Sequence, residues 1–163
     1  MFATFADTIN KTTIMKEIYF AGGCFWGTEH FFKQVEGVKD TETGFAETVK
    51  VVYDDNVVSL RFLLEMFFHA IDPTILNRQG HDEGTRYRTG VYFVDDSDEA
   101  VIRSYFADVQ KFYDKPIVTE ISKLQNYYPA EEYHQDYLDK HPDGYCHLPL
   151  ELFEFAKKAK ERK

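Results

Sequence analysis

A short run of glycine, cysteine and aromatic residues near the N-terminus limits what this chain can fold into more than any other feature. The run is Gly22, Gly23, Cys24, Phe25, Trp26 and Gly27. It follows a strand-like stretch at 17–21 and precedes residues 28–35, whose apolar positions fall on one helical face. Glycines permit a sharp turn because they lack a Cβ atom. The sequence therefore predicts a strand, a turn and a helix, with Cys24 at the start of the helix beside two large rings.

Further strands and helices follow at recognisable boundaries. Strands are predicted from β-branched and apolar runs at 49–53, 89–94 and 117–124. Helices are predicted at 59–71 with Ser59 as its cap, at 97–113, and at 130–141. This order favours an α+β fold, namely a split βαβ, ferredoxin-like two-layer sandwich with a mixed sheet and a loop-rich C-terminal segment.

Length and charge narrow the class of protein. A chain of 163 residues suits one domain, which we place at 16–163 after a loose extension at 1–15. The net charge of -9 argues against nucleic-acid binding, because phosphate contacts need clustered basic side chains. The sequence has no apolar run of about 18 residues and no signal-peptide pattern, so we expect a cytoplasmic protein that binds no membrane. A monomer is expected.

The chain has two cysteines, Cys24 and Cys146. Free N–H groups at a helix N-terminus lower the pKa of a thiol to roughly 3.5–7.5, so Cys24 is predicted to be a reactive thiolate. The alternative is a buried, inert core cysteine. Cys146 lies in a turn-rich stretch after Pro142, which predicts a mobile segment able to reach Cys24 once that residue is oxidised.

Other candidate site residues are selected by their position. Phe25 and Trp26 follow Cys24 and either form a methyl-sized apolar slot or pack in the core. Glu47 directly precedes a predicted strand. Asp82 and Tyr87 lie in the long polar loop at 72–88, and a loop of that length in a compact domain is usually functional.

Two other kinds of site were considered. The spacing of His141, Cys146 and His147 matches no common zinc pattern, so no metal is expected. A cysteine hydrolase, in which His30 or His134 activates Cys24, remains an alternative.

Many ordered elements of the chain resemble the A class of peptide methionine-S-sulfoxide reductases, from about Tyr19 to His147. The matching elements are Gly23-Cys24-Phe25-Trp26-Gly27, a Thr-Gly-x-Ala-Glu element ending in Glu47, Asp72-Pro73, Asn77-Arg78-Gln79-Gly80, Asp82, Gly84-Thr85, Tyr87-Arg88, Ala130-Glu131-Glu132-Tyr133-His134-Gln135 and Gly144-Tyr145-Cys146. The resemblance implies a cytosolic repair enzyme with a single catalytic domain and no cofactor or metal. It implies reduction of methionine-S-sulfoxide, free or in proteins, with thioredoxin as the reductant.

The resemblance also implies the role of each site residue. Cys24 would attack the sulfoxide sulfur and become a sulfenic acid, which Cys146 would convert to a disulfide. Phe25 and Trp26 would hold the methyl group of the substrate.

The remaining implied roles concern the sulfoxide oxygen. Tyr87 and Asp82 would bind and polarise the substrate. Glu47 would protonate the oxygen, which is a poor leaving group until it is protonated. A carboxylic acid kept neutral by a dry aromatic site suits this role.

The chain departs from the family pattern before Glu47. The family has a longer segment there, with a Gly-Tyr-x-x-Gly run and a Pro-Thr-Tyr segment, whereas Thr41, Glu42 and Thr43 nearly join the flanking parts here. The Pro-Thr-Tyr tyrosine has no counterpart, so the site would have one fewer hydroxyl donor and a lower turnover. A binding domain for oxidised methionine with impaired turnover is therefore a further alternative.

Overall fold

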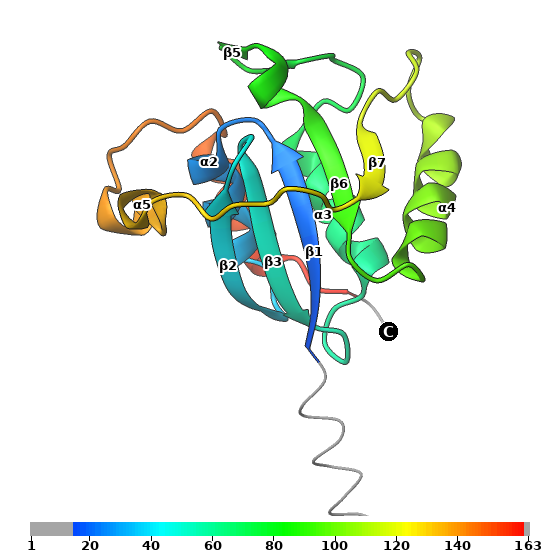
Figure 1. The fold of residues 1–163 in the computed structure, drawn as a ribbon, viewed down its shortest axis with the longest axis horizontal. Helices are drawn as coiled ribbons and strands as arrows, with labels where there is room; N and C mark the ends of the chain where they lie inside the picture. The colour runs from blue at the N-terminus through cyan, green and yellow to red at the C-terminus, as the bar shows by residue number, and fades with distance from the viewer. Residues whose placement is uncertain (1–14, 162–163) are drawn as a thin grey trace, which may run out of the picture.

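The computed structural model describes residues 15–161, so the predicted N-terminal extension lies outside the described residues except for Met15. A five-stranded sheet with the order β2-β3-β1-β6-β7 forms the centre of the molecule (Figure 1). The strands are β1 (Met15–Gly22), β2 (Val38–Gly44), β3 (Thr48–Asp54), β6 (Thr89–Phe93) and β7 (Glu120–Lys123). β7 runs parallel to β6, and the other neighbours are antiparallel, so the sheet is mixed as predicted.

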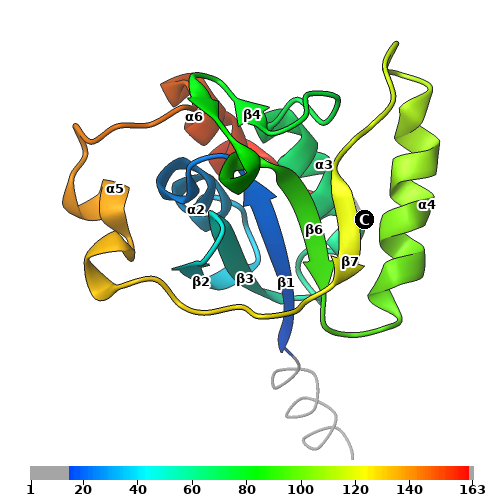
Figure 2. The same cartoon turned by 45° about the horizontal axis from the view of Figure 1, so that its top comes forward.

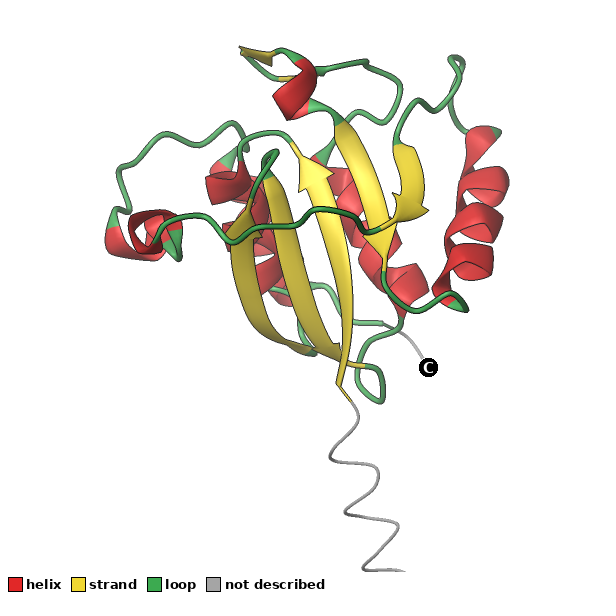
Figure 3. Ribbon diagram, in the orientation of Figure 1, coloured by secondary structure: helices red, strands yellow, loops and turns green. Residues whose placement is uncertain are grey.

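Helices pack behind and beside this sheet. They are α2 (Phe25–Lys33), α3 (Leu60–Ala70), α4 (Asp98–Gln110), α5 (Tyr137–Lys140) and α6 (Leu150–Lys158). The short elements are β4 (Arg78–Gln79), β5 (Asp82–Glu83) and the 3-10 turns η1 (Thr85–Tyr87) and η2 (Glu132–His134). In Figures 1 and 3, α2 and α3 lie behind the strands and α4 lies beyond β7. The α+β class is confirmed. No described helix is long and apolar enough to cross a membrane.

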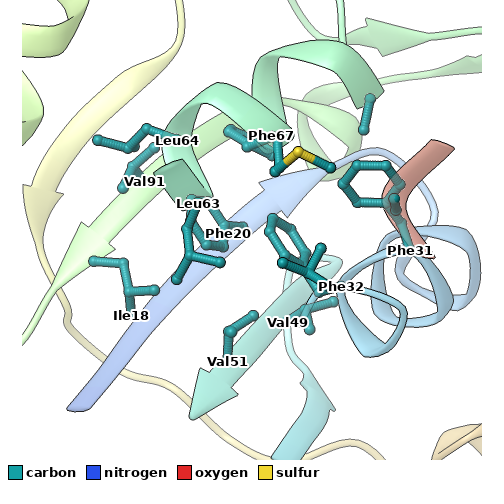
Figure 4. Packing of buried hydrophobic residues seen from close by; sticks show 14 of the residues in the cluster. Ile18, Phe20, Phe31, Phe32, Val49, Val51, Leu63, Leu64, Phe67 and Val91 are labelled. Atoms are coloured by element: carbon teal, nitrogen blue, oxygen red, sulfur yellow. The ribbon is translucent and has the colours of Figure 1, made fainter. Parts of the chain in front are cut away.

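From Ile18 onward, strand β1 is covered on both faces, which explains the continuous apolar run at 18–22. Ile18 and Phe20 are fully buried against the helices, where Phe20 stacks on Phe32 with ring centroids 4.5 Å apart (Figure 4). On the other face, Tyr19 packs edge-on against Tyr127 of the extended segment that crosses the sheet. The strand leading to Cys24 is therefore held rigidly from both sides.

Helix α3 forms as its sequence pattern predicts. Ser59 adopts an extended conformation, and its hydroxyl accepts a hydrogen bond from the Phe62 N–H at 3.1 Å, so the predicted cap is confirmed. Leu63, Leu64 and Phe67 are fully buried against the sheet. This helix supports the strands from which the site is built.

Three connections meet at one edge of the sheet. The end of β1 pairs with the start of β3 and with the start of β6. Cys24 follows β1, Glu47 precedes β3 and Tyr87 precedes β6. In Figure 2 this edge is turned toward the viewer, with β4 and α6 close to the start of α2. Strand register thus brings together candidate residues that are far apart in the sequence.

The predicted helix at 130–141 is wrong. The segment forms only η2 and α5, because Asp136 between them has a left-handed backbone with φ 53°. The Asp136 N–H donates to a carboxylate oxygen of buried Glu29 at 2.8 Å, and the Gln135 side chain bonds both backbone groups of Thr43. These contacts with α2 and β2 outweigh the local helical preference.

Candidate functional site

Cys24 is the N-cap residue of α2, as predicted, but the structure contradicts the expected thiolate. The side chain is buried, with 8% of the residue exposed. Burial raises the pKa of the Cys24 thiol to about 12, and this effect exceeds the lowering by the Trp26 backbone N–H. The negative charges of Glu47 and Asp82 raise the pKa further. Cys24 is therefore a protonated thiol at neutral pH in the substrate-free protein.

Glu47 lies beside Cys24, at the tip of the β2–β3 hairpin, and is 6% exposed. One carboxylate oxygen accepts the Phe25 backbone N–H at 3.0 Å, and the other lies 2.6 Å from Nη2 of Arg86. Both partners donate hydrogen bonds, and one carries a positive charge. The expected neutral acid in a dry site is therefore not what this geometry favours, because these contacts suit an ionised carboxylate.

The hairpin tip itself is strained. Ala46 and Glu47 both have left-handed backbones, with φ 54° and 52°, which costs roughly 1–2 kcal/mol for each residue with a Cβ atom. The Phe45 N–H compensates in part by donating to the Tyr128 carbonyl at 2.9 Å. The crossing segment thus fixes the tip, and the tip positions Glu47.

Aromatic residues surround a pocket of about 170 Å³ next to Glu47. Phe25 and His134 line it together with Glu47 and Arg86. Trp26 is half-buried, stacks on Tyr137 at 3.8 Å and donates from Nε1 to His134 Nδ1 at 3.1 Å. Phe25 thus lines the pocket directly, and Trp26 supports its wall through His134.

The two loop residues predicted for the site lie close to Cys24. Asp82 accepts a hydrogen bond from the Tyr145 hydroxyl at 3.0 Å. Tyr87 is half-buried in η1, and burial raises the pKa of its hydroxyl. Burial and the hydrogen bond to Asp82 raise the pKa of Tyr145 to about 12. Both tyrosines are therefore protonated and can donate hydrogen bonds.

Cys146 lies in the irregular segment between α5 and α6, and its side chain packs against α2. Its Sγ would be 3.0 Å from a Cβ atom placed on Gly27, and it accepts the Leu148 N–H at 3.4 Å. Gly27 is three residues after Cys24, and residues with this spacing are neighbours on a helix surface. Both cysteines are free thiols. Cys24 caps the first turn of α2, and Cys146 packs against Gly27 in that same turn.

Replacing Gly27 with alanine is expected to slow disulfide formation by roughly tenfold or more, since small displacements of reacting groups have effects of this size. The new methyl group would meet Cys146 at 3.0 Å and His147 at 3.1 Å. Alanine normally stabilises a helix by about 1 kcal/mol relative to glycine, so a methyl group that fitted would raise the melting temperature. A melting temperature of Gly27→Ala below that of the wild type would therefore show the clash independently. Loss of Cys146 thiol after oxidation, followed by mass spectrometry, measures the rate. An unchanged rate would contradict the close packing.

Three residues near the site were not predicted as site residues. Arg86 pairs with Glu47, Tyr145 bonds Asp82, and His147 packs beside Cys146. Tyr145 and His147 flank Cys146 in the sequence, which was the available signal. Arg86 directly precedes the predicted site residue Tyr87, but its pairing with Glu47, 39 positions away, had no signal in the sequence.

The histidines proposed for a hydrolase have other partners. His134 accepts from Trp26, whereas His30 lies 3.5 Å from a carboxylate oxygen of Asp139 and packs on Phe153. This geometry does not favour the hydrolase alternative. Among residues 15–161, no three His, Cys, Asp or Glu side chains are grouped as metal ligands.

The chain is similar to known proteins in both sequence and fold. A sequence profile of the peptide methionine sulfoxide reductase family matches residues 16–47 and 38–163. The methionine sulfoxide reductase MsrA of Mycoplasma genitalium is 51% identical, over 84% of this chain and all of that protein. Reduced Mxr1 of Saccharomyces cerevisiae superposes with a TM-score of 0.78 at 35% identity, covering 81% of this chain and 88% of that one. Mxr1 in complex with Trx2 superposes with a TM-score of 0.57 at 30% identity, covering 76% and 84%.

The comparisons also locate the shortened connection. The mycoplasma alignment has 157 positions but covers 84% of the 163 residues here, or about 137, so about 20 positions have no counterpart in this chain. Residues 38–47, which form β2 and the hairpin tip, match the family profile twice, and this overlap agrees with a missing segment before the element Thr43-Gly44-Phe45-Ala46-Glu47. In this chain β2 continues through this point into the hairpin that carries Glu47. The identity and coverage of these matches show that the chain belongs to the peptide methionine sulfoxide reductase family.

Proposed function

We propose that this protein reduces methionine-S-sulfoxide, free or within proteins, to methionine, with Cys24 as the nucleophile. One observation supports this proposal most strongly: the buried Cys24 thiol lies at the start of α2 close to both an acid, Glu47, and a second thiol, Cys146. A thiol can accept the sulfoxide oxygen and become a sulfenic acid, and a second thiol can then remove that oxygen as water.

In the first step, the sulfur of Cys24 attacks the sulfoxide sulfur. The oxygen ends on Cys24 as sulfenic acid, and methionine leaves, so the sulfoxide is reduced by two electrons and Cys24 is oxidised by two. The oxygen must be protonated during this step. Because Cys24 begins as a thiol and Glu47 as a carboxylate, Glu47 takes the thiol proton and passes it to the oxygen. This route differs from the expected neutral acid only in where the proton starts.

The pocket beside Glu47 suits the sulfoxide side chain. Phe25 forms an apolar wall for the methyl group, and Trp26 holds the neighbouring His134 ring in place. Tyr87 and Asp82 lie near Cys24 outside the lining of this pocket, where the Tyr87 hydroxyl would donate to the oxygen and Asp82 fixes Tyr145. The site lacks the additional tyrosine of the longer family segment, so we expect lower turnover than in relatives that have it.

In the second step, Cys146 attacks the sulfenic acid on Cys24, forms the disulfide and releases water. A dithiol reductant must then restore both thiols. The structure of yeast Mxr1 with Trx2 supports thioredoxin in this role. The electrons balance between thiols, sulfoxide and reductant, so these steps require no metal or organic cofactor. We also propose that residues 16–163 act as a single catalytic domain, in a monomeric cytoplasmic protein that binds neither nucleic acid nor membranes.

The Cys146→Ser variant tests this function. Without reductant, both the wild type and the variant should release one methionine per enzyme, because Cys146 enters only after the first step. The wild type should then contain a Cys24–Cys146 disulfide by mass spectrometry, whereas the variant should retain a sulfenic acid that dimedone traps. With thioredoxin, only the wild type should turn over repeatedly.

Two outcomes would contradict the proposal. If the wild type releases no methionine and keeps two free thiols, Cys24 is not a sulfoxide reductant. If it binds methionine-S-sulfoxide tightly and still releases no methionine, the chain is the oxidised-methionine binding domain considered above.

A further inference from the structure

His147 packs against the turn that carries Cys24. A Cβ atom on Gly23 would lie 2.9 Å from His147 Nε2, and one on Gly27 would lie 3.1 Å from His147 Nδ1. The ring therefore spans the backbone on both sides of Cys24. The sulfur of Cys146 lies 3.0 Å from the same position on Gly27. Nδ1 of His147 and Sγ of Cys146 thus face one small region beside the first turn of α2.

The hydrogen bonds of the ring determine which nitrogen is basic. Nε2 lies 3.0 Å from the Gly22 carbonyl oxygen, which can only accept, so Nε2 carries the proton. Nδ1 then has a free lone pair. It is buried and has no hydrogen-bond partner among the described residues. A buried acceptor without a partner costs about 1–3 kcal/mol, so its retention calls for an explanation.

The second step of the reaction needs such an acceptor. Burial raises the pKa of the Cys146 thiol, so Cys146 is protonated at neutral pH. The thiolate, not the thiol, is the effective nucleophile. Burial also lowers the pKa of His147, which keeps the ring neutral and able to take a proton. Glu47 is engaged by the Phe25 backbone N–H and by Arg86.

We propose that His147 Nδ1 is the proton acceptor for Cys146 when it attacks the oxidised Cys24. This inference rests on the proposed function. As the Cys146 S–H bond breaks, Nδ1 takes the proton and the sulfur forms the disulfide bond. The S–O bond of the sulfenic acid breaks, and the leaving hydroxide takes the proton back from His147 and departs as water. Cys24 is reduced from sulfenic acid to disulfide level, and Cys146 is oxidised to the same level.

The groups facing His147 are few. Glu47 and Asp82 contribute negative charge that favours the imidazolium formed during the step, and their effect is smaller than that of burial. Cys24 and Cys146 are further titratable groups close to this turn. The rate of disulfide formation should therefore depend on the His147 ring over the neutral pH range.

The experiment follows disulfide formation after a single turnover in His147→Gln. Glutamine can still donate to the Gly22 carbonyl but is a poor base. At about pH 7, disulfide formation should slow by roughly 10²-fold, and the deficit should shrink toward about pH 10 as hydroxide replaces the base. Methionine release should be unchanged, which shows that the site is intact. His69→Gln, on the exposed part of α3 beside Phe155, is the matched control and should behave as wild type.

The outcomes separate this inference from the proposed function. The role of His147 alone is overturned if His147→Gln releases methionine normally and forms the disulfide as fast as the wild type. It is also overturned if the variant forms the disulfide more slowly by the same factor at every pH. No methionine from the wild type overturns the proposed function. If the variant folds poorly, the pH dependence of the wild type is a further test. The rate of disulfide formation in the wild type should be constant through neutral pH. A tenfold rise per pH unit, as for an unassisted thiol, would overturn the inference.

Discussion

Replacing Cys24 with serine is expected to abolish methionine formation, with a residual rate of about 10⁻⁴ of wild type or less, the scale seen when nucleophiles are removed from enzymes. The reason lies in the chemistry of the product. The sulfoxide can lose its oxygen only to a group that becomes oxidised, and a thiol becomes a sulfenic acid whereas a hydroxyl group has no corresponding state. Methionine released per enzyme in a single turnover, measured by mass spectrometry, provides the test.

The fold must survive this change for the result to be informative. Cys24 contacts little water, so serine buries a hydroxyl group at a cost of about 1–3 kcal/mol if the hydroxyl finds no partner. Thermal unfolding shows whether the variant is folded. Cys146→Ser is the matched control, since it removes the other thiol and keeps the first methionine. Substantial methionine release by folded Cys24→Ser would exclude Cys24 as the nucleophile.

The Glu47→Gln variant is expected to lower kcat by roughly 10²–10⁴-fold, the range for general acid–base groups. Glutamine keeps the shape and can still accept the Phe25 backbone N–H. It cannot carry a proton from the Cys24 thiol to the sulfoxide oxygen. KM should change less than kcat, because the apolar wall of the pocket is unaffected. Steady-state kinetics with thioredoxin, together with single-turnover methionine release, separate the two effects.

A second glutamate on the same pocket serves as the control. Glu131 lines the pocket but is exposed, so Glu131→Gln changes the local charge by the same amount without touching the proton route. Its kcat should stay within a few-fold of wild type. If kcat falls equally in both variants, the effect of Glu47→Gln is only one of charge. If kcat of Glu47→Gln falls by less than tenfold, Glu47 does not transfer the proton.

Much of the fold was predictable because local patterns encode it. The Gly22-Gly23 turn, the apolar face of α3 and the Ser59 cap each depend on residues a few positions apart. Strand β2 could not be delimited in this way, since Asp40, Thr41, Glu42 and Thr43 carry no alternating apolar pattern. Its pairing with β3 depends on the short hairpin instead. The break at Asp136 was also missed because its cause, Glu29, is distant in the sequence.

The sequence by itself indicated the family and selected Cys24 and Cys146 as the candidate thiols of the site, because residue types and short motifs such as Gly23-Cys24-Phe25-Trp26-Gly27 and Gly144-Tyr145-Cys146 carry this information. The tertiary structure decided the states of those groups. Burial makes Cys24 a thiol rather than a thiolate, Arg86 holds Glu47 as an ion pair, and packing on Gly27 places Cys146 at the same helical turn. Protonation and proximity depend on desolvation and on charges contributed by distant segments, which no local pattern records.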